Sequence, residues 1–209
     1  MQGLGRAVAA ALLAAGISGA SAQTLRVGMF EDLDIMDPAL SRTFSGLQIL
    51  SAVCDKLFDL TPDLQVIPAL ATAHEWTDGG RGLVMRLREG VTFQDGAPFD
   101  AEAVRANIER QMTLQGSFRR GEMPDVTGVT VLGSHTARID LRQPFVPLFS
   151  ILVTRGGMMV SPRAMDQGRD FQRNPVCSGP FRMVERVPLD RIVLDRWPGH
   201  WNAANIHVQ

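Results

Sequence analysis

The feature of this sequence that most constrains its fold is the stretch from Trp76 to Met112, where signals for a turn, a strand, a second turn and a helix follow one another. The motif WTDGGRG at 76–82 concentrates glycine and aspartate, which favour turns with positive φ. Asp95-Gly96 marks the second turn, and Asp100 is suited to cap the helix that follows. Apolar residues alternate in the strand and recur every four residues in the helix, at Leu83, Met85 and Leu87 and at Val104, Ile108 and Met112.

Similar signals predict strands and helices on both sides of this stretch. Strands are expected at 24–30, 126–132, 136–141, 181–187 and 191–197, helices at 43–57 and from 162, and a polar loop at 116–125. The helix at 43–57 carries an apolar stripe: Leu47, Leu50, Cys54 and Leu57. Because strands outnumber helices and the two are interleaved, the sequence predicts an α/β fold of the mixed α+β kind.

The composition is that of a globular protein with enough apolar residues for a core. The chain has 209 residues, of which 45% are hydrophobic and 21% charged, and its formal net charge is -1. Binding to nucleic acid requires an excess of basic residues to neutralise phosphates. We therefore expect no nucleic-acid partner.

The first 22 residues have the layout of a secretory signal peptide. One basic residue, Arg6, precedes an apolar stretch at 8–17, and small residues follow up to Ala22. The apolar stretch is too short and too rich in alanine for a comfortable membrane span, and no cysteine follows it to carry a lipid anchor. We expect cleavage after Ala22, a periplasmic mature chain and no stable membrane span in that chain.

Two cysteines, Cys54 and Cys177, are the only ones in the chain. An oxidising compartment allows such a pair to form a disulfide. The apolar stripe of the predicted helix turns Cys54 toward the core, where a distant segment can reach it. The alternative is two unrelated buried cysteines, because free cysteine is commonly buried.

The sequence offers no catalytic group, metal site or cofactor site. It contains no G-x-S-x-G, H-E-x-x-H or C-x-x-C motif, and GGRG at 79–82 lacks the lysine and hydroxyl residue of a phosphate-binding loop. The histidines, expected to have packing or solvated roles, are His74, His135, His200 and His207. We expect no enzyme, and a hydrolase is the weakest alternative because no pair of nucleophile and base can be named.

Parts of the chain together resemble a known family. The residues from Trp76 to Arg110 are similar to the signature of periplasmic extracytoplasmic solute-binding proteins of family 5, with its tryptophan, aspartate-glycine turn, L-R-x-G-V-x-F strand and D-G-x-P-F helix entry. The stretch from Asn174 to Trp201 resembles the family's P-V-G-T-G-P-F/Y segment and the hairpin after it, and 30–60 is also similar. Members of this family are the oligopeptide, dipeptide, nickel and glutathione receptors of ABC importers.

The chain departs from the family pattern at three positions and in length. Gln94 stands where a histidine is frequent, Cys177 replaces a usual glycine, and Cys54 stands where tyrosine is common. The resemblance implies that both cysteines lie in the same lobe, which favours the disulfide. Family members run to more than twice this length, so the resemblance implies a truncated chain.

The fold implied by the resemblance is a type II periplasmic-binding-protein architecture that has been cut short. The first lobe would comprise residues 23–62 and resume at 174–209, with a smaller inserted subdomain at 63–173 and the second lobe missing. Solutes of this family bind between two lobes that close on one another, so half of the cleft would be absent. A monomer is expected.

The function implied by the resemblance is solute binding without catalysis. The chain would deliver a peptide or a small peptide-like solute to an ABC permease complex in the inner membrane. The residues expected to line the cleft are Phe44, Ser45 and Gly46, together with Arg155, Gly156, Gly157 and Met158. Two alternatives stay open: another solute, such as glutathione, a nickel complex, a sugar or an opine, or a non-binding remnant that acts as an interaction fragment.

Overall fold

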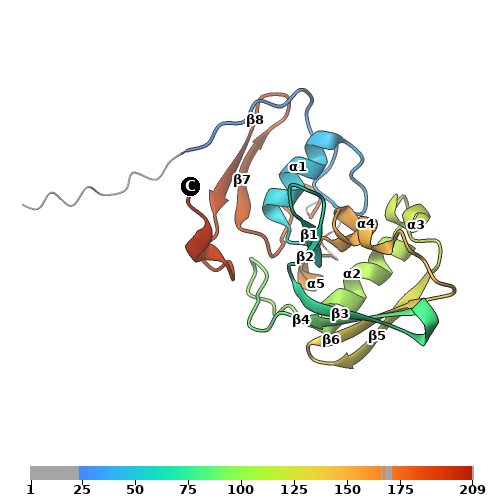
Figure 1. The fold of residues 1–209 in the computed structure, drawn as a ribbon. Coiled ribbons are helices and arrows are strands. Elements are labelled where there is room, and N and C mark those ends of the chain that lie inside the picture. The colour runs from blue at the N-terminus through green and yellow to red at the C-terminus, as the bar shows by residue number, and fades with distance from the viewer. Residues whose placement is uncertain (1–23, 166, 168–170, 209) are drawn as a thin grey trace, which may run out of the picture.

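The computed structural model describes residues 24–165, 167 and 171–208, so the predicted signal peptide lies outside the described residues. The helices are α1 (Phe44–Val53), α2 (Ala101–Thr113), α3 (Arg119–Glu122), α4 (Leu148–Leu152) and α5 (Pro162–Met165). The strands are β1 (Phe58–Leu60), β2 (Val66–Pro68), β3 (Ala71–Thr77), β4 (Gly82–Leu87), β5 (Val126–Gly133), β6 (Thr136–Leu141), β7 (Phe181–Val187) and β8 (Arg191–Arg196). The mixed α/β class predicted from the sequence is confirmed (Figure 1).

The largest sheet is antiparallel, with the strand order β3-β4-β6-β5, and α2 packs on one of its faces (Figure 1). The predicted alternation of β4 is confirmed, because Leu83, Met85 and Leu87 are buried while Arg86 on the opposite face is exposed. The turn between β3 and β4 contains Asp78 at a φ of 52° and Gly79 at 65°. These left-handed conformations explain the glycine-rich sequence of the turn.

Helix α2 begins where the sequence predicted. The side chain of Asp100 accepts a hydrogen bond from the backbone N–H of Ala103 at 2.9 Å, which satisfies a donor that the first helical turn leaves free. Val104 and Ile108 are fully buried against the sheet, and Met112 is partly buried. This periodic face of α2 and the inner face of the sheet form the larger of two apolar cores, which we call the sheet core.

A second apolar core, which we call the α1 core, forms around α1 from segments that are distant in sequence. Its buried members include Leu33, Leu50, Met158 and Phe171, and side chains of β7 and β8 pack against it. In Figure 1 the β7–β8 hairpin lies at the left, the large sheet at the lower right, and α1 between them. The domain boundaries expected near residues 62 and 173 stay a prediction.

The predicted disulfide is confirmed, since Cys54 and Cys177 are joined across 123 residues of sequence. Cys54 follows the last residue of α1, and the N–H of Gly179 donates to the carbonyl of Val53 at 2.9 Å. The Gln94 side chain lies beside this bridge and donates to the carbonyl of Phe181 at 2.8 Å. The Gln94 amide therefore ties the 91–98 turn to the start of β7.

Three elements differ from the sequence prediction. Residues 24–30 form no strand, and Leu25 and Val27 are each 66% exposed, because no neighbouring strand pairs with them among the described residues. Helix α1 ends at Val53 and not at Leu57, because Cys54 takes an extended conformation. The expected loop at 116–125 contains the short helix α3, whose Arg119 is buried.

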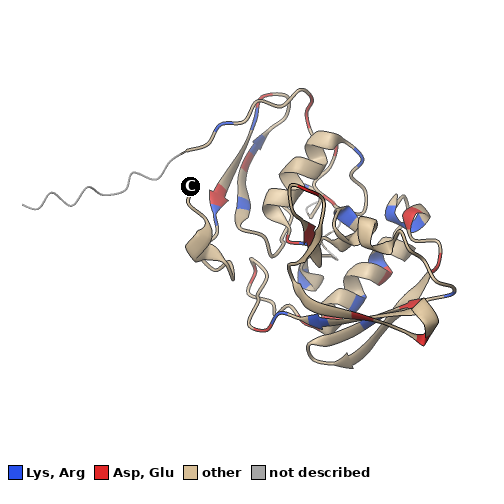
Figure 2. Cartoon of the chain, in the orientation of Figure 1, with Lys and Arg blue, Asp and Glu red and all other residues tan. Residues whose placement is uncertain are grey.

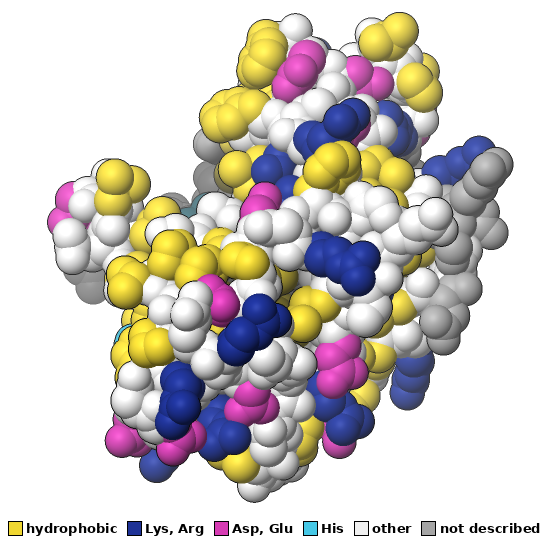
Figure 3. All heavy atoms as spheres, turned by 90° about the vertical axis from the view of Figure 1, so that its right-hand side faces the viewer, with side chains coloured by type: hydrophobic (Ala, Val, Ile, Leu, Met, Phe, Trp, Pro, Cys, Tyr) yellow, Lys and Arg dark blue, Asp and Glu magenta, His cyan; other side chains and the backbone are white. Residues whose placement is uncertain are grey.

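Charged side chains are spread over the fold. Figure 2 shows cationic and anionic residues on both the large sheet and the β7–β8 hairpin, and on the face drawn in Figure 3 the two signs are intermingled with apolar side chains. Within the described ranges, no helix has the length and apolar character needed to cross a membrane.

Candidate functional site

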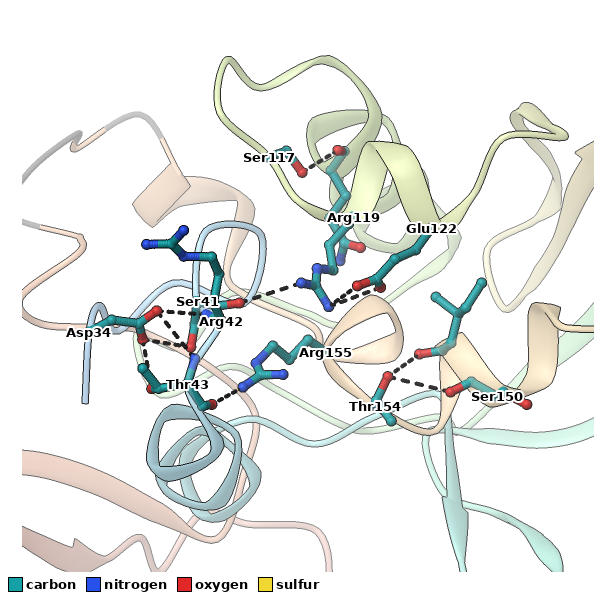
Figure 4. Close-up of polar contacts among 12 residues, drawn as sticks. Asp34, Ser41, Arg42, Thr43, Ser117, Arg119, Glu122, Ser150, Thr154 and Arg155 are labelled. Carbon is teal, nitrogen blue, oxygen red and sulfur yellow. Dashed lines mark hydrogen bonds and ion pairs between the residues drawn. The ribbon is translucent and has the colours of Figure 1, made fainter. Parts of the chain in front are cut away.

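Two carboxylates contact the amino-terminal end of α1: Glu31 accepts from the backbone N–H of Ser45 at 3.4 Å, and Asp34 organises the loop before the helix. Asp34 accepts hydrogen bonds from the backbone N–H of Arg42 at 2.6 Å, from the Ser41 hydroxyl at 2.9 Å and from the Thr43 hydroxyl at 3.0 Å (Figure 4). The Thr43 hydroxyl in turn accepts from the N–H of Gly46 at 3.0 Å and caps the helix. The loop before α1 is thereby held in one conformation.

The same contacts set the ionisation of Asp34. Partial burial acts to raise the pKa of the Asp34 carboxyl, but hydrogen bonds from the backbone of Arg42 and Ile35 and from the hydroxyls of Ser41 and Thr43 outweigh it. The pKa of Asp34 lies below its ordinary value, so the carboxylate stays charged at neutral pH.

Arg155, a candidate from the sequence, lies against this end of α1. Its guanidinium Nη2 donates to the carbonyl oxygen of Thr43, the capping residue (Figure 4). The side chain is 9% exposed, and its Nε has no hydrogen-bond partner among the described residues. The 3-10 turn Arg155–Gly157 and α1 are therefore brought together although about a hundred residues separate them in sequence.

A second arginine, Arg119 of α3, approaches the same loop. Its Nη2 donates to the carbonyl of Ser41 at 3.4 Å, and its Nη1 lies 2.9 Å from the carboxylate of Glu122 (Figure 4). Burial lowers the pKa of Arg119, while the charge of Glu122 acts to raise it. Burial also lowers the pKa of Arg155, and the like charge of Arg119 adds to this effect against opposing contributions from Asp34 and Glu122.

The other residues predicted at the start of α1 differ in accessibility. Phe44 is 57% exposed, and its ring centroid lies 6.4 Å from that of Phe30. Ser45 is fully buried, and its hydroxyl oxygen has no hydrogen-bond partner among the described residues. Gly46 is also buried, and a Cβ there would collide with the Ser41 and Thr43 hydroxyls, which explains the absence of a side chain.

The three cleft candidates that follow Arg155 in sequence are closely packed against other parts of the protein. A Cβ on Gly156 would collide with the Ile151 side chain, and one on Gly157 with the carbonyl of Leu152. Met158 is fully buried in the α1 core. Whether any of the seven predicted residues contacts a solute stays a prediction, and the structure brings Phe44, Ser45, Gly46 and Arg155 to one place.

Sequence reasoning missed Asp34 and Arg119. Asp34 is one of several acids in a turn-rich segment, and its role depends on the folded loop at 41–43. Arg119 is buried whereas its neighbour Arg120 is exposed, and both occur in one polar run of the sequence. No local sequence pattern distinguishes Arg119 from Arg120. Arg119 is buried because α3 contacts the loop before α1, which is distant in sequence.

The described residues were also compared with the arrangement that a metal site requires. No group of three or more His, Cys, Asp or Glu side chains in these parts of the chain is arranged to hold a metal ion. The packing role expected for histidine is observed at His200, whose Nε2 lies 3.0 Å from the carboxylate of Asp55. Trp201 donates to the same carboxylate at 2.8 Å, so Asp55 fixes the segment after β8.

Comparison with known proteins gives one family. Residues 65–208 match the family described as bacterial extracellular solute-binding proteins, family 5 Middle. This match covers more than half of the chain and includes β7–β8 and most of the sheet core, whose members Leu57 and Phe58 precede it.

Individual relatives are similar over most of this chain. The glutathione-binding protein GsiB of Salmonella paratyphi A is 29% identical over 183 residues, which cover 87% of this chain and 36% of that protein. The crystal structure of NikA from Brucella suis in complex with Fe(III)-EDTA has a TM-score of 0.72 at 26% identity, over 80% of this chain and 34% of NikA. A periplasmic oligopeptide-binding protein from Borrelia burgdorferi shares the fold with a TM-score of 0.79 at 22% identity, over 85% of this chain and 40% of that protein. The chain therefore spans little more than a third of the length of these relatives.

Proposed function

The chain belongs to the bacterial extracellular solute-binding proteins of family 5, and we propose from this membership that it is the solute-binding component of an ABC importer, with peptides as its solutes. It acts by binding and delivering a solute, and it catalyses no reaction. Its place is the periplasm, and its partner is the permease complex in the inner membrane. The signal-peptide layout of residues 1–22 supports export.

Peptides are proposed as the solute because of what similar proteins bind. One relative is a glutathione-binding protein, and one structure with the same fold is an oligopeptide-binding protein. Glutathione is itself a small peptide, so both kinds of solute carry amide and carboxylate groups.

The observation that carries the proposal is the meeting of Arg155 with the start of α1. Binding sites concentrate polar groups that converge from separate elements on one place. Here a guanidinium, a capped helix start and the exposed ring of Phe44 come together from two distant segments. We propose that the solute lies against this surface, and that the first lobe comprises residues 23–62 and 174–209 around the subdomain 63–173.

A second candidate solute is an anionic metal chelate. NikA from Brucella suis, which is 26% identical to this chain, was solved with Fe(III)-EDTA. A chelate of this kind carries several carboxylates, which an arginine at the start of α1 can also bind. The candidate differs from a peptide in having no backbone amides.

The test is a thermal melt of the purified chain with tri-alanine, glutathione, Fe(III)-EDTA or sucrose at increasing concentration. A ligand that binds only the folded state raises the melting temperature with concentration. We expect a rise with tri-alanine or glutathione and none with sucrose. A rise with Fe(III)-EDTA alone would replace peptides by the chelate, and no rise with any of the four would contradict solute binding.

A pair of matched variants locates the site. Phe44→Ala removes a ring at the proposed surface, and Leu132→Ala removes a side chain of similar exposure, 53%, on β5 of the large sheet. We expect Phe44→Ala to weaken peptide binding and Leu132→Ala to leave it unchanged, as measured by calorimetric titration. Equal affinities for both variants would place the solute elsewhere.

A further inference from the structure

We propose that residues 24–30 pair with the outer edge of β8 in a second copy of this chain, so that two copies exchange these segments and form a dimer. The inference goes beyond solute binding and does not depend on it. It differs from the monomer that the family resemblance implies. It depends on three observations: a segment with the pattern of a strand but no neighbour, a sheet edge without a neighbour, and a register that matches their apolar and charged side chains.

The first observation is the unpaired segment at 24–30. Its apolar residues alternate as in a strand, but the segment forms no strand in the structure, and all seven residues are exposed. Leu25 and Val27 are each 66% exposed, and Phe30 is 77% exposed. Unpaired backbone groups beside exposed apolar side chains favour association with another chain. A neighbouring strand would satisfy the backbone and cover one apolar face of the segment.

The second observation is the free edge of β8. Strands β7 and β8 form a sheet of two strands, in which β7 is the one that contacts α1. Beyond β7, no strand of the described chain pairs with β8. Ile192 and Leu194 of β8 pack against the α1 core but are only partly buried. Because a sheet of two strands is marginally stable alone, a third strand on this edge would stabilise it and cover the apolar side chains.

The segment leaves the body of the protein at the tip of the β7–β8 hairpin. Asp32 accepts a hydrogen bond from the backbone N–H of Leu189 at 3.1 Å, and the carbonyl of Leu33 accepts one from Arg186 at 3.0 Å. From there the segment, drawn in blue in Figure 1, continues beyond the tip without pairing with its own β8. Two copies that meet at their hairpin tips around a two-fold axis can each place this segment on the β8 edge of the other.

The third observation is the register that this pairing allows. In an antiparallel pair with Val27 opposite Leu194, apolar side chains meet on the face that packs against the α1 core. Met29 then lies opposite Ile192 on the same face. A shift by one residue would turn the apolar side chains of the segment to the other face, so the pattern restricts the pairing to this register and to shifts of two.

The charges select one register among these. With Val27 opposite Leu194, Arg26 lies opposite Asp195 on the outer face. Asp195 forms no ion pair among the described residues, although Arg182 stands across from it on β7. Opposite charges directly across an antiparallel pair stabilise it, whereas like charges destabilise it. A shift by two residues in either direction loses this ion pair, so charge complementarity supports a second copy in this register.

The direct test is the molar mass of the purified chain, measured by sedimentation equilibrium over a range of concentrations. We expect the mass to rise with concentration from that of one chain to that of two. A mass of one chain throughout overturns the proposal, because the segment would then stay free or pair within its own chain. A mass that grows beyond two chains also overturns it, since an exchange around a two-fold axis is closed. No solute is present, so either result leaves the proposed function untouched.

A variant of the apolar face assigns the dimer to the segment. Val27 is exposed in the single chain, so Val27→Asp should leave the folding of that chain unchanged, whereas pairing would bury the new carboxylate against the α1 core. Leu132→Asp on β5, at a position 53% exposed, is the matched control. We expect Val27→Asp to weaken dimerisation by at least about tenfold and Leu132→Asp to leave it unchanged. Equal dimerisation by Val27→Asp and the unchanged chain would contradict the proposal.

Mixing two charge variants distinguishes exchange between copies from pairing within one chain. Arg26→Asp and Asp195→Arg each place like charges opposite one another at both pairings of a dimer, and each alone should dimerise about tenfold more weakly. An equimolar mixture restores opposite charges at both pairings, so we expect it to dimerise as tightly as the unchanged chain. Arg120→Asp, at an exposed position on α3 at the opposite end of the molecule in Figure 1, is the control and should have no effect. A mixture that dimerises no better than the two variants alone overturns the exchange.

Discussion

The sheet core and the α1 core of this protein are stabilised by different means. The sheet core is built from strands and a helix that follow one another between residues 57 and 159, and its apolar residues recur at regular spacing. The α1 core collects residues from before α1, from 158–177 and from β7–β8. It is crossed by the Cys54–Cys177 bridge and by the Gln94 amide. Regular apolar patterns thus suffice where neighbours in sequence supply the core, and specific links are found where distant segments supply it.

The largest expected effect comes from breaking the α1 core at its disulfide. Replacing Cys54 and Cys177 together by alanine should lower the free energy of unfolding by up to about 4–5 kcal/mol, because the bridge restricts a long loop of the unfolded chain. Urea titrations of both proteins with and without reductant measure the difference. With reductant, the wild-type chain should unfold at the same urea concentration as the double variant. Reductant should not change the unfolding of the double variant itself.

Hydrogen exchange on the same double variant tests the contrast between the cores. Amides of α1 and β7 should lose protection before those of β4 and β6, because the bridge stabilises the α1 core and not the sheet core. Simultaneous loss of protection throughout would mean that the two cores unfold as one unit.

The second largest loss of stability is expected where α2 of the sheet core contacts Val160 of the α1 core. Asn107 of α2 is 2% exposed, and its amide both donates to the carbonyl of Val160 and accepts from the N–H of Val160, each at 2.9 Å. Asn107→Leu leaves two buried backbone groups unsatisfied and should cost about 2–4 kcal/mol in urea titration. Asn174→Leu, at an exposed position, is the control and should change stability little. A small effect of Asn107→Leu would show that the cores are coupled by other contacts.

A smaller effect is expected at the cap of α2, within the sheet core. Asp100→Ala removes the acceptor for the N–H of Ala103 and should lower the unfolding free energy by about 1 kcal/mol. Asp100→Asn keeps a capping oxygen and should retain most of the stability. If alanine and asparagine were equally destabilising at this position, the charge of Asp100 and not its hydrogen bond would be the stabilising property.

The smallest effect concerns the pH dependence of the loop before α1. The pKa of Asp34 is lowered in the folded state, because its hydrogen bonds outweigh burial, so its stabilising contribution is present above the ordinary value of 3.8 and is lost as the pH falls through the lower folded value. Asp34→Asn should therefore flatten the acid side of a plot of melting temperature against pH, and leave the slope above pH 6 unchanged. An identical acid slope in both proteins would contradict this assignment.

Several elements could be predicted from sequence because local patterns specify them. The capping residue Asp100, the alternation of β4 and the turn between β7 and β8 all occur where the pattern places them. The strand expected at 24–30 was wrong because a strand requires a hydrogen-bonding neighbour, and alternation of apolar residues does not provide one. The buried state of Arg119 was missed for a similar reason, since it depends on a contact with the loop before α1.

By itself, the sequence determined the class of fold, the main elements of the sheet core and the resemblance to the family. It also indicated the pairing of Cys54 with Cys177 and named Arg155 as a candidate. Tertiary structure alone decided that Arg155 lies buried against the cap of α1, with Arg119 approaching the same loop. The physical reason is range: propensity and periodicity act over a few residues, whereas the desolvation and pairing of a charge depend on segments that meet only in the folded chain.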